Sequence, residues 1–212
     1  MKLIKTMVFS IGLSICFATA GIAQNNNIRP AKDQIKAAVS PAPKSMQAGA
    51  KVLGYNQQGE LVTLRKGSED NLLICLADDP QNPNFHVSCY YKQLEPFMKY
   101  GREMRAKGKN HEEVDSLRIV AIKEGKFKMP DGPAALYSLT GGSDAFDYTT
   151  GTVRKARPLY VVYIPYATKA STGLSKEPVS KGAPWIMEPG KPWAHIMVPT
   201  GRMVGTQTEN NN

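Results

Sequence analysis

Hydrophobic residues recur every three or four positions in two neighbouring segments of this sequence, over 94–104 and again over 114–121. This spacing predicts two consecutive amphipathic helices. Pro96 suits the first turn of the first helix, and Asn110 with Glu113 forms a capping pattern at the start of the second. Strand-like runs lie before and after this helical section. The order predicts an α+β domain with a mainly antiparallel sheet and two consecutive helices inserted between N-terminal and C-terminal strands.

The strands are predicted from short runs rich in β-branched and aromatic residues and bounded by turn residues. The clearest run, 159–164, reads Leu-Tyr-Val-Val-Tyr-Ile. A polar loop ending in Gly59 joins the runs 52–55 and 61–65, and a turn around Pro189 and Gly190 joins the runs 185–187 and 194–198. Each of these two pairs predicts a hairpin. The remaining runs lie at 72–76 and 134–139.

The N-terminal segment 1–23 has the three parts of a secretory signal peptide. Lys2 and Lys5 supply positive charge, an apolar run follows over 7–17, and small residues lead up to Ala23. This order predicts cleavage after Ala23. The mature protein is therefore expected to be exported, to the periplasm or the extracellular space.

Two other uses of this segment stay open. The uncharged run 6–23 approaches the length of about 18 residues that can serve as a membrane anchor, although Ser, Thr and Gly residues dilute it. Cys16 could be the acylated residue of a lipoprotein, although Ile15 stands where a small residue is preferred. Beyond this segment the sequence has no apolar stretch of that length, so no transmembrane segment is expected after cleavage.

The mature chain is predicted to be one domain with flexible ends. Residues 24–50 contain few large apolar side chains, which predicts a disordered tether. The polar tail 205–212 is also expected to be disordered. Between them, residues 51–204 are predicted to form the single α+β domain.

The chain is basic, with a formal net charge of +9. This excess predicts attraction to an anionic envelope component such as lipid headgroups or polysaccharide, although the same charge also favours solubility alone. The densest basic group lies over 99–109. No recognisable RNA- or DNA-binding motif accompanies it in the sequence, so no specific nucleic-acid partner is expected.

Removal of the signal would leave two cysteines, Cys75 and Cys89. An even number of cysteines in an oxidising compartment predicts a disulfide. The bridge would close a loop of about 15 residues and stabilise the fold by about 3 kcal/mol. Free thiols remain an alternative, as does a metal site that includes His86, although the sequence offers no fourth ligand at a recognisable spacing.

The C-terminal hairpin carries the candidate ligand-binding residues Trp185, Trp193 and His195. If Trp193 and His195 lie in one strand, they share a face because side chains alternate along a strand. Aromatic rings left open on such a face would bind a small molecule or an envelope component without catalysis. In the alternative interpretation, the Trp rings fill the core and His195 satisfies a backbone group.

A hydrolase is the main alternative function. Ser143 lies in a Gly-Gly-Ser-Asp segment that resembles a nucleophile turn, with Ala145 in place of the final glycine, and His195 could be its base. A β-turn explains the same residues without chemistry. His86, His111 and His195 show no metal-ligand spacing, and no phosphate-binding loop is found, so no cofactor or metal is expected. A purely structural envelope protein is the third possibility.

Several segments occur in a characteristic order. They are a Thr-Leu-Arg-x-Gly segment at 63–67, the cysteine pair, a Lys-Met-Pro stretch at 128–130, the Gly-Gly-Ser-Asp turn at 141–144, and a Gly-x-Pro-Trp-x-Met and Pro-Trp-Ala-His-Ile-Met-Val-Pro ending at 182–199. In this order they resemble a family of uncharacterised small exported bacterial proteins. The resemblance covers residues 61–200. It implies an exported single domain, and it implies no activity and no functional residue.

Overall fold

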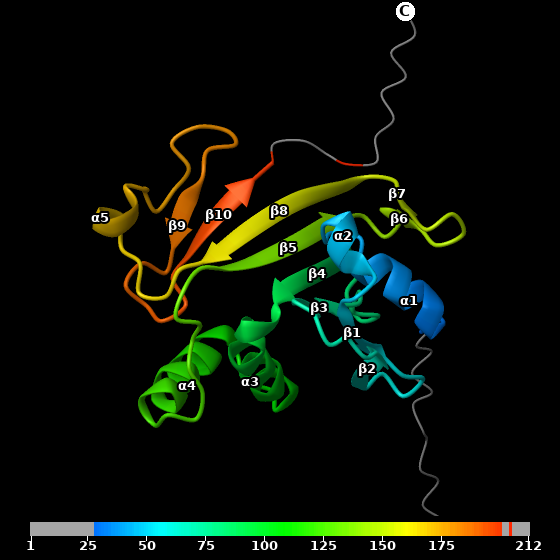
Figure 1. The fold of residues 1–212 in the computed structure, drawn as a ribbon, viewed down its shortest axis with the longest axis horizontal. Helices are drawn as coiled ribbons and strands as arrows, with labels where there is room; N and C mark the ends of the chain where they lie inside the picture. Colours follow the sequence, from blue (N-terminus) through cyan, green and yellow to red (C-terminus); the bar gives the residue numbers. More distant parts are fainter. Residues whose placement is uncertain (1–27, 201–203, 205–212) are drawn as a thin grey trace, which may run out of the picture.

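The computed structural model describes residues 28–200 and Val204, and a large twisted sheet dominates this part of the chain (Figure 1). Its strands are β1 (Lys51–Tyr55), β2 (Leu61–Arg65), β3 (Leu73–Leu76), β4 (Phe85–Tyr91), β5 (Ala134–Gly141), β8 (Ala156–Tyr163), β9 (Trp185–Met187) and β10 (His195–Pro199). They are ordered β2-β1-β3-β4-β5-β8-β10-β9. Neighbouring strands are antiparallel except for the parallel pair β1 and β3. The predicted α+β class with a mainly antiparallel sheet is confirmed, and the sheet is mixed.

Helices lie in three places along the chain. They are α1 (Ala31–Ala38) and α2 (Lys44–Gln47) before the first strand, α3 (Glu95–Ala106) and α4 (His111–Lys123) between β4 and β5, and the short α5 (Lys169–Thr172). A second, two-stranded sheet pairs β6 (Phe146–Asp147) with β7 (Thr152–Val153). The sequence patterns indicated neither α1, α2 and α5 nor the strand β4.

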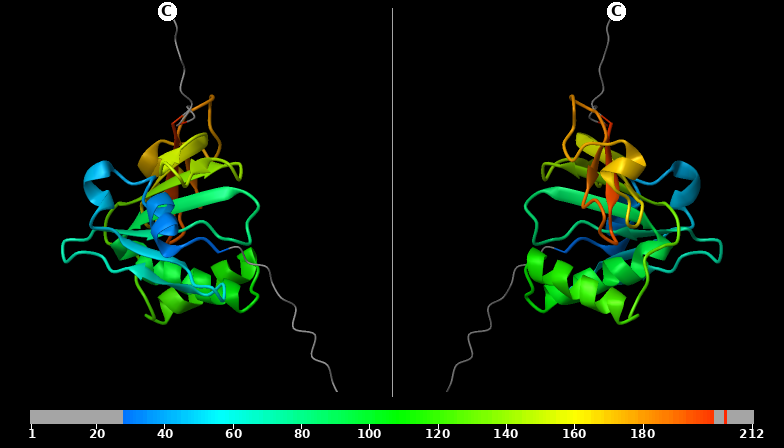
Figure 2. Two further views of the ribbon diagram at one scale, coloured as in Figure 1. Left: turned by 90° about the vertical axis from the view of Figure 1, so that its right-hand side faces the viewer. Right: turned by 90° about the vertical axis from the view of Figure 1, so that its left-hand side faces the viewer.

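The two faces of the large sheet carry separate hydrophobic clusters, because successive residues of a strand point in opposite directions. Leu53 and Ile74 contribute to the cluster that includes residues of α3 and α4. Their neighbours Val52 and Cys75 belong to a second cluster, which α1 and the segment after it cover. Figure 2 shows the green helices α3 and α4 below the strands and the blue helices away from them. The sheet is therefore the central layer, with helices packed against both of its faces.

The predicted start of the second helix is confirmed at Asn110. Its side chain accepts a hydrogen bond from the backbone N–H of Glu113 (3.0 Å), and the Glu113 carboxylate accepts one from the backbone N–H of Asn110 (2.9 Å). Val120 belongs to the predicted buried stripe of the second helix, but it is 48% exposed. The buried face of α4 is therefore rotated from the predicted one. Arg118 is buried instead, with its guanidinium carbon 3.9 Å from the centre of the Phe97 ring. A charged side chain lies inward here because its flat group packs on an aromatic face.

The prediction of a disordered tether over 24–50 is wrong for residues 28–50. Ala37 and Ala38 of α1 are almost fully buried against the sheet. Small side chains let the helix backbone approach closely, so this segment packs without the large apolar residues that the prediction required. The folded part of the chain thus begins before residue 51. Residues 24–27, the predicted signal peptide 1–23 and the predicted tail 205–212 lie outside the described residues.

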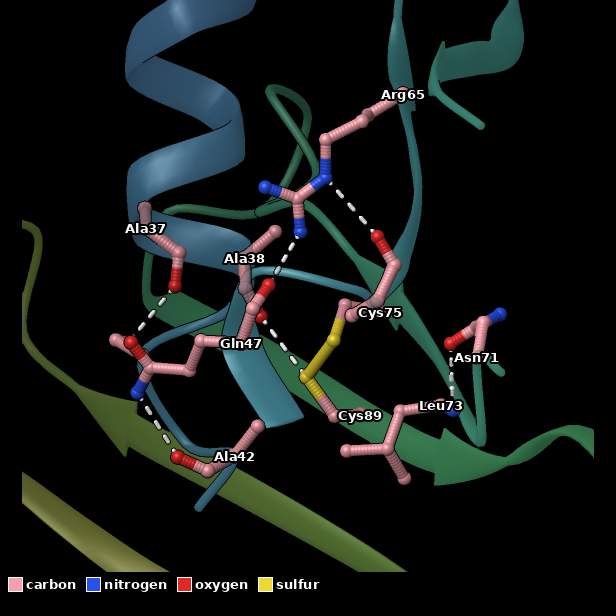
Figure 3. The surroundings of a disulfide bond; sticks show 11 residues. Ala37, Ala38, Ala42, Gln47, Arg65, Asn71, Leu73, Cys75 and Cys89 are labelled. Atoms are coloured by element: carbon pink, nitrogen blue, oxygen red, sulfur yellow. Dashed lines mark hydrogen bonds between the residues drawn. A yellow bond between two sulfur atoms is a disulfide. The ribbon is translucent and has the colours of Figure 1, made fainter. Parts of the chain in front are cut away.

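The predicted disulfide between Cys75 and Cys89 is present (Figure 3). The two residues are directly paired in the antiparallel register of β3 and β4, with their Cα atoms 4.0 Å apart. Both are completely buried. The Cys89 sulfur lies 3.2 Å from the carbonyl oxygen of Ala38, so the bridge packs directly under α1. The free-thiol and metal alternatives for this pair do not hold in the structure.

Candidate functional site

Trp193 is a core residue. It is 3% exposed, and its ring stacks on that of Phe97 from α3, with centroids 5.9 Å apart. It lies in the turn before β10. The prediction that strand alternation would direct Trp193 and His195 to one face therefore does not apply. For Trp193, the structure supports the alternative in which the ring fills the core.

His195, the first residue of β10, is tied to the backbone of its own hairpin. Its Nδ1 lies 2.8 Å from the carbonyl oxygen of Trp193. Burial lowers the pKa of His195, which favours the neutral ring with Nδ1–H as the donor. Trp185 lies half-buried on the edge strand β9, opposite Met197. Neither of the two cavities described below is lined by Trp185, Trp193 or His195.

The structure does not bring Ser143 and His195 together. Ser143 follows Gly141, at one end of the eight-residue strand β5. His195 pairs with Tyr163, which in turn pairs with Ala134 at the other end of β5. The two side chains are therefore about 20 Å apart or more, at a rise of about 3.3 Å per residue. The structure therefore does not support Ser143 and His195 as a nucleophile–base pair.

Within residues 28–200 and at Val204, no three His, Cys, Asp or Glu side chains are grouped as a metal site would require. No helix in the same part of the chain has the length and hydrophobicity needed to span a bilayer.

A cavity of about 290 Å³ lies where α1, the end of β1 and the loop between β3 and β4 meet; we call it the Arg29 cavity. Its walls include Arg29 before α1, Tyr55 at the end of β1 and Asp78 after β3. Tyr148 and Ser143, from the segment after β5, complete the rim. Four parts of the chain that are far apart in the sequence thus form one concave surface.

The basic side of this cavity is a stacked pair. The guanidinium carbon of Arg29 lies 3.7 Å from the centre of the Tyr148 ring. The ring of Tyr148 is held from another side by Phe146, at a centroid distance of 5.0 Å. Burial and the nearby Asp78 carboxylate raise the pKa of Tyr148, so its hydroxyl keeps its proton. Stacking on an aromatic ring fixes the plane of a guanidinium while its N–H groups point outward in that plane.

The acidic side of the cavity is Asp78. One of its carboxylate oxygens, Oδ1, accepts a hydrogen bond from the backbone N–H of His86 (2.8 Å). Burial raises the pKa of Asp78, and the neighbouring Asp79 raises it further, against the opposing effects of the His86 N–H and of Arg29. Burial, together with the nearby Asp79 carboxylate, raises the pKa of Tyr55 to about 12. A half-buried carboxylate is thus held in place at the wall.

The buried side chain of Gln34 fixes the two walls relative to each other. Its Nε2 donates to the carbonyl oxygens of Arg29 (2.7 Å) and Tyr55 (2.9 Å), and its Oε1 accepts from the backbone N–H of Tyr55 (2.8 Å). Phe85 and Ala37, each 1% exposed, add apolar surface to the lining. The two walls are therefore connected by hydrogen bonds, and the lining is partly apolar with charged groups of both signs.

A second, wider groove of about 670 Å³ lies between the β1–β2 hairpin and α3, and it shares Tyr55 and Asp79 with the Arg29 cavity. Part of the dense basic group over 99–109 faces it. Arg102 is paired with Glu95 (2.9 Å), and Lys99 lies 3.7 Å from Glu103. Because these cations are neutralised by acids of the same helix, this surface is less positive than the sequence alone suggests.

The sequence patterns did not single out Arg29, Asp78 or Tyr148. Arg29 lies within the predicted tether, and Asp78 lies in a proline-containing segment between predicted elements. The raised pKa of Asp78 and the stacking of Arg29 both arise from contacts between distant segments. A sequence pattern that records local spacing holds no signal for such a site.

The fold and the Arg29 cavity define this chain as a disulfide-bridged α+β protein with a small, polar, pre-formed cavity. No protein-family model, curated protein or solved structure matches the chain. Its resemblance to a family of small exported bacterial proteins stays a prediction, and its function must be inferred from its own geometry.

Proposed function

We propose that this protein binds a small polar molecule in the Arg29 cavity and does not convert it chemically. The observation that carries this proposal is a cavity of about 290 Å³ whose walls combine a stacked guanidinium, a half-buried carboxylate and buried apolar side chains. Ligand sites are typically concave and largely pre-formed, with a few placed polar groups on an apolar lining. Ser143, at the rim, lies far from His195, so the cavity lacks that nucleophile–base pair.

A structural role alone accounts poorly for the charged groups of this cavity. Burying part of a carboxylate costs free energy unless a partner compensates it. Asp78 has one backbone N–H partner, and its pKa is nevertheless raised. Perturbed ionisable groups in a concave site are typical of functional sites. We therefore favour a ligand, which supplies the missing compensation, over the purely structural alternative.

We also propose that the protein works outside the cytoplasm, in the periplasm or the extracellular space. The buried Cys75–Cys89 bridge supports this, because stable disulfides are typical of oxidising compartments. The signal-like order of segment 1–23 supports it independently. The net charge of +9 is compatible with an anionic envelope component as an additional partner. Lys99 and Arg102, which face the second groove, are paired with acids, so we place the ligand in the Arg29 cavity and not in that groove.

Export predicts that the mature protein begins at Gln24. Protein recovered from the envelope or the medium of its host should give Gln24 as its N-terminal residue by Edman degradation or intact mass. Mature protein that still carries Met1 would contradict cleavage and favour the anchor alternative. A lipid-modified Cys16 at the N-terminus would instead establish the lipoprotein alternative.

Filling the cavity is expected to remove the bound molecule. Ser143 is exposed at the rim, so Ser143→Trp places an indole in the opening with little effect on the core. Native mass spectrometry of wild-type protein purified from its own host should show a bound small molecule. Its occupancy should fall by about tenfold or more in Ser143→Trp, which corresponds to a loss of about 1.4 kcal/mol.

The matched control is Ser180→Trp, at an exposed position that lines neither cavity. This variant should retain the molecule as the wild type does. Equal retention by all three proteins would place the ligand elsewhere. The absence of any bound molecule from all three would favour the structural alternative.

A further inference from the structure

We infer that the Arg29 cavity takes a small zwitterion, a molecule with an anionic carboxylate at one end and an ammonium group at the other, of the size of a free amino acid. This inference rests on the proposed function, because it names the class of ligand for the same site. It follows from three features of the lining: a cation, an anion and several buried apolar side chains.

Arg29 supplies the site for the carboxylate. Its guanidinium is exposed at the rim and is held 3.7 Å above the ring of Tyr148. A guanidinium has five N–H donors in a fixed plane, and two of them match the two oxygens of a carboxylate. The carbonyl oxygen of Arg29 is anchored by Gln34 (2.7 Å), so both ends of this residue are positioned before a ligand arrives. This arrangement reduces the entropy lost on binding.

Asp78 supplies the site for the ammonium group. Its Oδ1 is occupied by the backbone N–H of His86, which leaves Oδ2 for a ligand. Asp79 lies beside it and adds negative charge to the same wall. Two neighbouring carboxylates repel each other, and an ammonium group between the walls relieves that repulsion. A neutral ligand would leave only Arg29 and the His86 N–H to offset this negative charge.

Part of the lining is apolar. Phe85, Ala37 and Ile28 are all buried residues that contribute to the lining. Such a surface accepts the hydrocarbon part of an amino acid. A neutral monosaccharide of similar size would form hydrogen bonds with the polar side chains but would leave the charges of Arg29 and Asp78 without ionic partners. The lining therefore favours a zwitterion with a short apolar side chain over a neutral sugar.

The test is isothermal titration calorimetry of the full mature chain with free L-amino acids, titrated one at a time, and with glucose as a neutral probe. At least one amino acid should bind. Its N-acetyl derivative lacks the ammonium charge, and its amide lacks the carboxylate. Each should bind about ten- to one-hundred-fold more weakly, the range expected for loss of one charge-assisted hydrogen bond.

Two variants test which charged residue binds which end of the ligand. Arg29→Gln should weaken binding of the free amino acid and abolish the preference for the acid over the amide. Asp78→Asn should abolish the preference for the free amine over the N-acetyl derivative. A general loss of structure would reduce binding of all probes alike and would not remove one preference selectively. The matched controls are Lys181→Gln and Asp131→Asn, both at exposed positions outside the cavity, and they should bind as the wild type does.

Three results would overturn the inference, and they differ in what they leave standing. Glucose binding that Ser143→Trp blocks would refute the zwitterion and preserve the proposed function. Amino-acid binding that is unaffected by Arg29→Gln and Asp78→Asn would refute this site. Failure of every probe to bind, together with no bound molecule in protein from the host, would refute both the ligand class and the proposed function.

Discussion

Replacement of Trp193 by alanine is expected to lower the free energy of unfolding by about 3–5 kcal/mol, the usual cost of truncating a buried aromatic residue. Trp193 is 3% exposed and stacks on Phe97. It belongs to the cluster that joins α3 and α4 to the sheet, so its removal leaves a cavity at the contact between these layers. Urea denaturation followed by circular dichroism measures the change, because Trp fluorescence is itself altered by the substitution.

Trp185→Ala is the matched control. Trp185 lies half-buried on the edge strand β9, so its truncation should cost no more than about 2 kcal/mol. A larger loss of unfolding free energy in Trp193→Ala than in Trp185→Ala would indicate a core role for Trp193. A Trp193→Ala protein that remains as stable as the wild type but loses its ligand would restore Trp193 as a binding residue.

Loss of the Cys75–Cys89 bridge is expected to lower the free energy of unfolding by about 3 kcal/mol, because the bridge restricts the unfolded chain. The two cysteines are 14 positions apart, and the strands that carry them are paired through backbone hydrogen bonds. The native fold should therefore survive without the bridge, at reduced stability. Urea denaturation of a Cys75→Ala, Cys89→Ala double variant measures the change.

The reductant dithiothreitol provides the control for this prediction. It should lower the urea midpoint of the wild type toward that of the double variant, and it should leave the midpoint of the double variant unchanged. Because both cysteines are fully buried, reduced protein that has been separated from dithiothreitol without air should be labelled at its thiols slowly below the unfolding transition and fast above it. Equal midpoints for wild type and double variant would contradict the stabilising role.

Local patterns predicted the elements whose determinants are local. The run 159–164 predicted β8, and the capping pattern at Asn110 predicted the start of α4. The strand β4 has the alternation of a half-buried strand, with His86 and Ser88 between buried residues, but it directly follows a loop with two prolines and contains no continuous apolar run. The helix α1 was missed because it buries alanines and Gln34 in place of large apolar side chains. These residues gain their burial from the tertiary contacts they make.

The candidate site could not be predicted for the same reason. The prediction for Trp193 and His195 assumed that both lie in one regular strand, whereas the strand begins at His195 and the turn before it directs Trp193 toward α3. Arg29 and Asp78 are brought to one cavity by the packing of α1 onto the sheet. No pattern of residues within either segment records that packing.

The location of the ligand site can be measured directly by two-dimensional ¹H–¹⁵N NMR of the mature protein, titrated with the small-molecule extract of its own host. We predict that the amide signals of Arg29, Tyr55, Asp78, Phe85 and Tyr148 shift together and saturably, and that those of Trp185, Trp193 and His195 do not. Shifts confined to the C-terminal hairpin, or the absence of any saturable shift, would contradict a binding site in the Arg29 cavity.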